Sequence, residues 1–294
     1  MEFIIYDDYA GMLIKDFLRK KEFSSGVIKK LKKLDDGILV NGIHQNVVYT
    51  LKKGDRLTIK LTDTCDDINS NLLPINLPVE ILYEDDNITV VNKPGNMPTH
   101  PSINNFDNTL ANALAFRYKG KSYVFRAINR LDKDTSGVVV TANNKFYSAL
   151  LSKRLVNKEI TKEYVAVVSG KLEGAGVIEA PIARVGKSII KREIRQDGEY
   201  AETHYEVLAA CNDASLVRVF PKTGRTHQIR VHFAYLGHPI IGDGLYFEKS
   251  EYISRQALHC LRMDIRGIGD FYAKLPQDMM ELIRRYFGNE QIIP

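Results

Sequence analysis

Hydrophobic and polar positions in the first sixty residues predict two short helices followed by short strands. Apolar residues at helical spacing predict a first helix that carries Phe17. A second helix follows, which Ser24 or the serine after it can cap and Gly37 can end. The segments I-L-V-N-G (38–42) and L-K-K-G-D-R-L-T-I (51–59) predict strands that border turns.

From about residue 75 onwards, strands and helices are mixed without regular βαβ alternation. Two apolar runs, Val79–Tyr83 and Ile88–Asn92, flank E-D-D-N and predict a hairpin. Residues 171–200 are rich in Gly and Lys with little periodicity, which predicts a long, mobile excursion. This order of elements favours an α+β fold over a doubly wound sheet. Further strands are predicted over Val138–Thr141, Tyr164–Val168, Ala201–Leu208, Leu216–Phe220 and Ala257–Ile265, and helices over Thr109–Tyr118, Phe146–Leu155, Thr226–Leu236 and Asp278–Phe287.

A polar segment divides these two patterns. Residues 62–74, T-D-T-C-D-D-I-N-S-N-L-L-P, are rich in turn formers and predict a linker. We therefore expect two domains, residues 1–72 with the linker and residues 73–294.

Positive charge is concentrated in the first of these domains. Residues 12–60 hold 12 Lys or Arg against 5 Asp or Glu, a balance of +7, which leaves −2 for the rest of a chain whose net charge is +5. Such asymmetry suggests a polyanion bound there, with nucleic acid the leading candidate. A solvated lysine face that keeps the protein soluble explains the charge alone equally well.

Composition excludes several classes of protein. With 44% hydrophobic and 26% charged residues, the chain is typical of soluble globular proteins. No apolar run approaches the ~20 residues that span a bilayer, and the first residues do not resemble a signal peptide. Three distant cysteines, Cys65, Cys211 and Cys260, indicate neither a disulfide framework nor a zinc site, and they suit the cytoplasm. Nucleotide-binding glycine motifs are also missing, so we expect no cofactor, no metal and no membrane partner.

Candidate chemistry begins with the stretch N-R-L-D-K-D-T-S-G (129–137), which holds two carboxylates just before a β-branched run. Asp134 is expected to shape the turn through Gly137, which leaves Asp132 as the reactive candidate. In an extended chain the two carboxylates would share one side, so a pair as in glycoside hydrolysis stays physically possible.

A second candidate stretch, P-K-T-G-R-T-H-Q-I-R-V-H (221–232), predicts a helix with Arg230 on a half-apolar face. A buried guanidinium needs a carboxylate, and Asp132 can supply it. Arg225 adds a positive charge where the helix start already attracts anions, although an exposed basic helix end explains it as well. His227 and His232 are five residues apart, which does not suit a shared metal ion on a helix.

Several of these stretches together carry a family resemblance. R-L-D-K-D-T-S-G (130–137), K-E-Y-V-A-V-V-S-G (162–170) and G-R-T-H-Q-I-R-V-H…L-G-H-P-I-I-G-D (224–243) occur in the order seen in the RluA family of RNA pseudouridine synthases, which residues 75–290 closely resemble. The N-K-P…H-P and Q-A-L-H-C-L stretches fall where that family has counterparts. The helix pair, V-N-G and K-G-D of the first domain resemble the S4 RNA-binding module.

The resemblance implies a fold, a reaction and a set of roles. It implies an α+β catalytic domain with a mixed, mostly antiparallel central sheet, preceded by a small S4-like α/β domain, which acts on structured RNA as a cytoplasmic monomer. The substrate would be uridine in RNA, ribosomal before transfer RNA, converted to pseudouridine after the base is flipped out. Asp132 would be the catalytic carboxylate, Arg230 its partner, and Tyr164 the ring that stacks on the base and a candidate acceptor of the C5 proton. RNA contacts are expected from Arg130, which helps to displace the base, and from Arg225, His227, Val231, Lys29, Lys30 and Lys33.

One departure from the family pattern bears on this reading. Asn129 stands where the family usually has histidine, and an amide forms hydrogen bonds without carrying charge. If this side chain only supports the loop, activity should survive; if it positions RNA, affinity or target choice should change. Two other functions stay open: an RNA-binding assembly factor or chaperone with an idle enzyme domain, and a glycosidase or nucleosidase that uses both aspartates.

Overall fold

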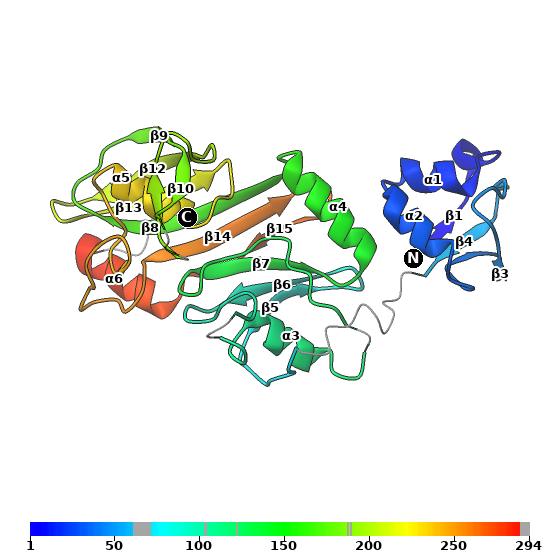
Figure 1. The fold of residues 1–294 in the computed structure, drawn as a ribbon, viewed down its shortest axis with the longest axis horizontal. Helices are drawn as coiled ribbons and strands as arrows, with labels where there is room; N and C mark the ends of the chain where they lie inside the picture. The colour runs from blue at the N-terminus through cyan, green and yellow to red at the C-terminus, as the bar shows by residue number, and fades with distance from the viewer. Residues whose placement is uncertain (61–71, 103–104, 122, 187, 189, 289–294) are drawn as a thin grey trace.

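A computed structural model describes residues 1–60, 72–102, 105–121, 123–186, 188 and 190–288. These residues form a small sheet near the N-terminus, a large sheet and a separate two-stranded hairpin (Figure 1). The predicted linker, residues 62–74, lies outside the described residues up to position 71, so the division between residues 72 and 73 stays a prediction.

Two helices pack on the N-terminal sheet. Apolar side chains of both helices, among them Phe17 and Leu31, share one buried cluster with the strand residues Ile38 and Leu57. Burial of these side chains away from water holds the small unit together. The helices are α1 (Ile14–Lys20) and α2 (Ser25–Leu31), after the 3-10 turn η1 (Asp7–Tyr9), and the antiparallel strands follow the order β1 (Glu2–Ile4), β4 (Arg56–Ile59), β2 (Ile38–Val40) and β3 (Ile43–His44).

The end of α2 differs from the prediction. Ser24 caps the helix as expected, because the backbone N–H of Val27 donates to Ser24 Oγ at 3.3 Å. The helix already ends at Leu31, however, and Gly37 lies in the following turns. A Cβ atom at Gly37 would lie 2.4 Å from the carbonyl oxygen of Leu31, so glycine is needed there for close approach of the chain rather than to end the helix.

Within the described residues, nine strands form the large sheet, which confirms the mixed, mostly antiparallel α+β fold. Neighbouring strands run antiparallel except β7 and β14, which pair in parallel through Ser136 and Gly137 with His259 and Cys260. The predicted hairpin is present as β5 and β6. In spatial order the strands are β5 (Glu80–Glu84), β6 (Ile88–Lys93), β7 (Ser136–Ala142), β14 (Leu258–Ile265), β8 (Ile160–Ser169), β13 (Ala214–Pro221), β12 (Glu202–Ala210) and β9 (Ala175–Glu179), while β15 (Gly269–Tyr272) pairs with β14.

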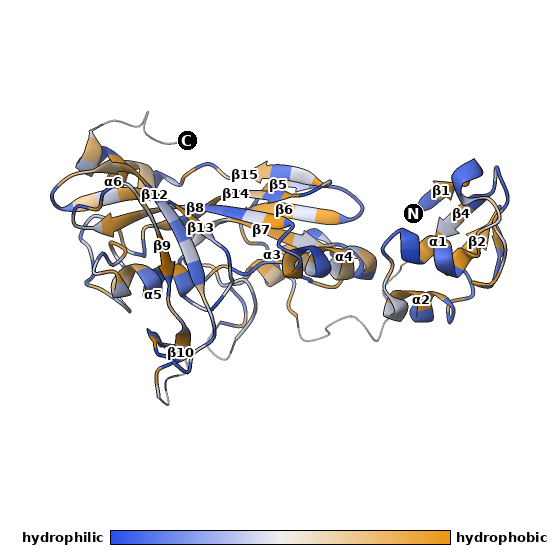
Figure 2. Ribbon diagram, turned by 90° about the horizontal axis from the view of Figure 1, so that it is seen from above, coloured by the Kyte–Doolittle hydropathy of each residue, from blue (hydrophilic) through white to orange (hydrophobic). Residues whose placement is uncertain are grey.

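Helices cover this sheet at the predicted places. They are α3 (Leu110–Arg117), α4 (Lys145–Val156), α5 (Gln228–Tyr235) and α6 (Gln277–Phe287). Seen from above, α5 and α6 lie on opposite sides of the sheet (Figure 2). Their buried side chains, with those of the central strands, make up the main hydrophobic core. Among the described residues, no helix is both long and apolar enough to cross a bilayer.

Residues 171–200, for which the sequence predicts a long, mobile excursion with little periodicity, hold three strands. Strand β9 joins the large sheet as its edge by pairing with β12. Strands β10 (Ile182–Arg184) and β11 (Arg192–Ile194) form a hairpin that extends from the body on the side of α5 (Figure 2). Ile178 is the only fully buried side chain of β9, so this edge strand carries almost no hydrophobic pattern in the sequence.

Helix α4 of the large unit contacts the N-terminal unit. Phe23 and Phe146 stack with ring centroids 3.8 Å apart, and Leu150 is buried in the same cluster. At the rim of this contact Lys153 Nζ lies 3.2 Å from a carboxylate oxygen of Glu22. An exposed ion pair of this kind adds little stability, so apolar packing dominates the contact.

Candidate active site

The loop that carries Asp132 is fixed to strand β7 by a buried asparagine. Asn129 Nδ2 donates to the carbonyl of Val138, and the N–H of Val140 donates to Asn129 Oδ1, both at 2.9 Å. The side chain therefore acts like an extra strand residue, which satisfies two buried backbone groups of β7. Of the two roles that the sequence left open for Asn129, these hydrogen bonds fit support of the loop.

The other end of the loop is held by Gly137. Its φ of +116° lies in a region that favours glycine, and a Cβ atom would lie 2.2 Å from the carbonyl oxygen of Cys260 on β14. Between these two fixed points, the N–H of Thr135 bonds to the carbonyl of Asp132 at 3.2 Å and closes a turn. The Asp134 carbonyl accepts from Arg255 Nη1 at 3.0 Å.

Arg230 bridges two carboxylates of unequal exposure. Its Nε and Nη2 donate to the two oxygens of Asp243 at 2.7 and 2.8 Å, and its Nη1 donates to Asp132 Oδ2 at 2.9 Å. The Asp243 side chain is 1% exposed and that of Asp132 is 27% exposed. The predicted pairing of Arg230 with Asp132 is thus present, and Asp132 is the partner that a substrate can reach.

The two carboxylates keep the guanidinium of Arg230 protonated. Burial acts to lower the pKa of its guanidinium, but the hydrogen bond and charge of Asp243, with those of Asp132, outweigh burial and raise the pKa above its ordinary value. A permanent cation that donates to Asp132 fixes the orientation of its carboxylate.

His227 also faces the carboxylate of Asp132, and its backbone is strained. It precedes α5 with φ +58°, a left-handed conformation that is uncommon for a residue with a side chain. Its Nε2 lies 3.8 Å from Asp132 Oδ2, and its Nδ1 lies 2.8 Å from the hydroxyl of Tyr246. Burial lowers the pKa of this imidazole, which keeps it neutral near pH 7.

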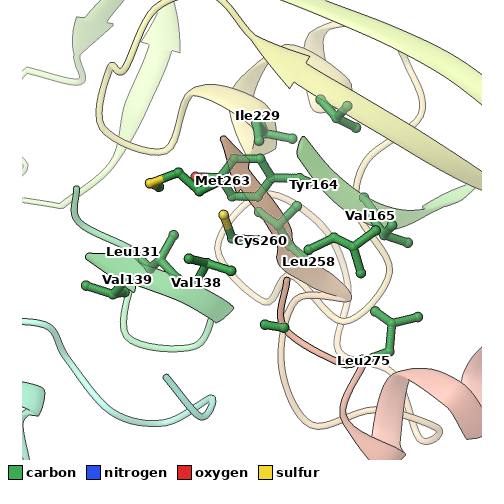
Figure 3. Close-up of a cluster of buried hydrophobic side chains, with 14 of the residues drawn as sticks. Leu131, Val138, Val139, Tyr164, Val165, Ile229, Leu258, Cys260, Met263 and Leu275 are labelled. Atoms are coloured by element: carbon green, nitrogen blue, oxygen red, sulfur yellow. The ribbon is translucent and has the colours of Figure 1, made fainter. Parts of the chain in front are cut away.

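Tyr164 lies deeper, on β8, opposite Cys260 of β14. Figure 3 shows its ring among the side chains of Ile229, Leu131 and Met263. Burial first, and then Cys260 and the charge of Asp132, raise the pKa of the phenol well above its ordinary value. The hydroxyl therefore keeps its proton at neutral pH.

Other predicted residues lie apart from Asp132. Arg130 is exposed, on the loop just before it. Arg225 donates from Nε to the carbonyl of Tyr200 at 3.0 Å and pairs with Glu199 at 3.2 Å, on the side of the β10–β11 hairpin. Lys29, Lys30 and Lys33 are exposed in the N-terminal unit, on α2 and just after it.

Val231 corrects one expectation. Its side chain is buried with Ile182 and Ala201 beneath the β10–β11 hairpin. It supports that hairpin and is only 4% exposed, so its side chain offers little surface for a contact with RNA. His232 is also buried, and its two nitrogens lie within hydrogen-bond distance of Thr203 Oγ1 and the Ala180 carbonyl.

Sequence reasoning missed three residues of the site: Tyr246, whose hydroxyl lies beside His227, and also Asp243 and Lys93. Asp243 was part of a quoted stretch, but only the fold shows that it lies under Arg230. Lys93, fully buried, donates to the carbonyls of Pro94, Met97 and Lys133, and so ties the N-K-P stretch to the residue after Asp132. Burial lowers the pKa of Lys93 to about 7. The described residues hold no group of three or more His, Cys, Asp or Glu placed to bind a metal ion.

Comparisons with known proteins agree on one family. A family model described as RNA pseudouridylate synthase matches residues 87–235. The uncharacterized RNA pseudouridine synthase YjbO of Bacillus subtilis is 36% identical over 93% of this chain and 99% of its own length. The ribosomal large subunit pseudouridine synthase D of Yersinia pestis is 34% identical over 95% of this chain and 87% of its own. Among solved structures, the protein named human RNA pseudouridylate synthase domain containing 1 is 29% identical, with a TM-score of 0.57. The match covers 68% of this chain and 84% of the human chain.

Proposed function

The chain belongs to the RNA pseudouridylate synthase family and is an RNA pseudouridine synthase, and from this premise we propose that Asp132 converts a flipped-out uridine of large-subunit ribosomal RNA to pseudouridine. The observation that carries the role of Asp132 is its pairing with Arg230, whose other side is held by the buried Asp243. The ribosomal substrate is supported by the name of the Yersinia pestis relative, and it would place the enzyme in the cytoplasm.

The reaction needs a carboxylate and little else from the protein. The bond between C1′ and N1 breaks, the uracil rotates, and a bond between C1′ and C5 forms. C5 loses a proton and N1 gains one, so the RNA keeps its composition. Asp132 either attacks C1′ or removes the proton from C2′, and in both routes the ionised form paired with Arg230 is the reactive one.

Tyr164 is proposed to stack on the uracil within the site. The apolar side chains around its ring suit a base that has left its stack in RNA, and stacking offsets part of the cost of extrusion. Because the buried phenol keeps its proton at neutral pH, stacking is favoured over removal of the C5 proton by the free enzyme.

Residues 1–72 are proposed to form an S4-like RNA-binding module with its linker, and residues 73–294 the catalytic domain. The exposed Lys29, Lys30 and Lys33 would contact phosphates, which gives affinity that falls steeply with salt. Arg130 and Arg225 would contact RNA nearer the reacting uridine. The expectation of a monomer stays a prediction.

The test compares two neighbouring carboxylates. The wild-type enzyme and the variants Asp132→Asn and Asp134→Asn are incubated with ribosomal RNA from cells that lack the gene, and pseudouridines are mapped by chemical labelling. Asp132→Asn should lose roughly 10³-fold or more of the rate, whereas Asp134→Asn should stay within a few-fold of wild type. Unchanged activity of Asp132→Asn would refute the proposal. Release of free uracil would indicate a nucleosidase, and a cellular function that survives Asp132→Ala would indicate a binding protein.

A further inference from the structure

A short hydrogen-bonded chain leads from the β10–β11 hairpin to Asp132. The backbone N–H of Arg192 donates to the hydroxyl of Tyr246 at 2.9 Å, and this hydroxyl lies 2.8 Å from His227 Nδ1. The other imidazole nitrogen, Nε2, faces Asp132. The Tyr246 ring also contacts His227 edge to face and lies 5.1 Å from the guanidinium carbon of Arg230.

The donors and acceptors in this series of hydrogen bonds indicate the tautomer of His227. The hydroxyl of Tyr246 accepts a hydrogen bond from the backbone N–H of Arg192, and its own single proton then has His227 Nδ1 as the acceptor within reach. Burial keeps the imidazole neutral; Arg230 and Arg192 act in the same direction, against the opposing charges of Asp132 and Asp243. A neutral imidazole that accepts at Nδ1 carries its proton on Nε2.

A donor and an acceptor therefore face each other at a distance too long for a direct hydrogen bond. Nε2–H of His227 and the carboxylate of Asp132 are 3.8 Å apart. An oxygen atom beside both can lie at about 2.8 Å from each. It must accept from the imidazole and donate to the carboxylate, which a water molecule does in the free enzyme and a hydroxyl group of the substrate can do in its place, whereas a carbonyl or phosphate oxygen cannot.

We propose that His227 and Asp132 together bind the 2′-hydroxyl of the target ribose, and that Tyr246 is a positioning residue that holds His227 in the required tautomer. This inference rests on the proposed function, because the carboxylate that acts at C1′ or C2′ lies beside the 2′ position. The 2′-hydroxyl distinguishes RNA from DNA, so this pair would select ribose at the reacting nucleotide. The strained backbone of His227 fits a functional position.

The first test reads the tautomer and needs no RNA. Nuclear magnetic resonance of protein with nitrogen-15 in its imidazoles reports which nitrogen of His227 carries the proton. We expect Nε2 in the wild type and a mixture of tautomers in Tyr246→Phe. The matched control is Tyr252→Phe, because Tyr252 also faces an arginine, with the Arg285 guanidinium carbon 3.6 Å from its ring centroid. A wild-type proton on Nδ1 would overturn the proposal.

The second test measures how much the ribose 2′-hydroxyl contributes to RNA binding. RNAs with pseudouridine or 2′-deoxypseudouridine at the modified position bind without further reaction. The hydroxyl would form two hydrogen bonds, one of them to a charged carboxylate, so the wild type should bind the ribose form roughly 10–100-fold more tightly. His227→Asn should lose roughly 3–10-fold of this preference, because only the bond to Asp132 remains, whereas His227→Gln, whose longer side chain can place an N–H near Nε2, should lose less. Asparagine tolerates the left-handed backbone, so His227→Asn should fold.

The outcomes separate the two proposals. Equal binding of both RNAs by the wild type, or an unchanged preference in His227→Asn, would overturn the hydroxyl site even in an active synthase. A protein that shows the Nε2 tautomer and the ribose preference but forms no pseudouridine would refute the proposed function and leave the hydroxyl site standing.

Discussion

Removing the guanidinium of Arg230 should damage stability and activity by separable routes. In Arg230→Met, the Asp243 carboxylate, whose side chain is 1% exposed, loses both hydrogen bonds from Arg230 and the cation that pairs with it. Breaking a buried ion pair by removing one partner costs about 3–5 kcal/mol. Asp132, at 27% exposure, can take up water instead, so it adds little to this loss.

The assay is chemical denaturation of four proteins, together with pseudouridine formation. In the double variant Arg230→Met/Asp243→Asn the buried charge is gone, and most of the lost stability should return, because neutral replacements of buried pairs are often tolerated. Activity should stay low in the double variant, since Asp132 still lacks its cation. The control is Arg195→Met, an exposed arginine that also contacts two carboxylates, Asp197 and Glu193.

Two results would refute this reasoning. If Arg230→Met lost no more stability than Arg195→Met, which should cost about 1 kcal/mol or less, Asp243 would not depend on Arg230. If the double variant recovered activity together with stability, Arg230 would act only through folding and not through Asp132.

Three further predictions concern the support of the site. Gly137→Ala should cost at least about 3 kcal/mol in denaturation, because its Cβ would meet the Cys260 carbonyl. Gly11→Ala, which also has a positive φ but lies in open space, should cost only about 1 kcal/mol. Asn129→Leu should cost about 3 kcal/mol and slow catalysis, since two backbone groups of β7 lose their partners, and a variant as stable and active as wild type would contradict this. Burial lowers the pKa of His259 from 6.5 to about 4, so its uncharged form stabilises the fold above pH 6.5, and about 3 kcal/mol should be lost as the pH falls from 6.5 towards 4. His259→Gln should lose correspondingly less stability over that pH range. Equal losses in the variant and the wild type would show that His259 is not the group responsible.

The sequence alone determined the elements that carry strong periodic patterns and the chemistry that short motifs carry. Strand β7 was predicted close to its observed bounds because it is a continuous β-branched run, as in a buried strand, and helices α3 to α6 because their apolar residues recur at helical spacing. Asp132 and Arg230 could be paired in advance because a buried arginine on a half-apolar helix requires a carboxylate.

Only the tertiary structure decided what surrounds that pair. Strand β9 and the β10–β11 hairpin gain their order from β12 and α5, and such edge elements leave little pattern in the chain. Asp243, Tyr246 and Lys93 were not foreseen, because a hydrogen bond between distant residues follows from the packing of whole elements and not from local spacing. The N-R-L-D-K-D-T-S-G stretch contains Asp132, the carboxylate for which we propose the catalytic role, and the fold supplies the buried partners that hold it in place.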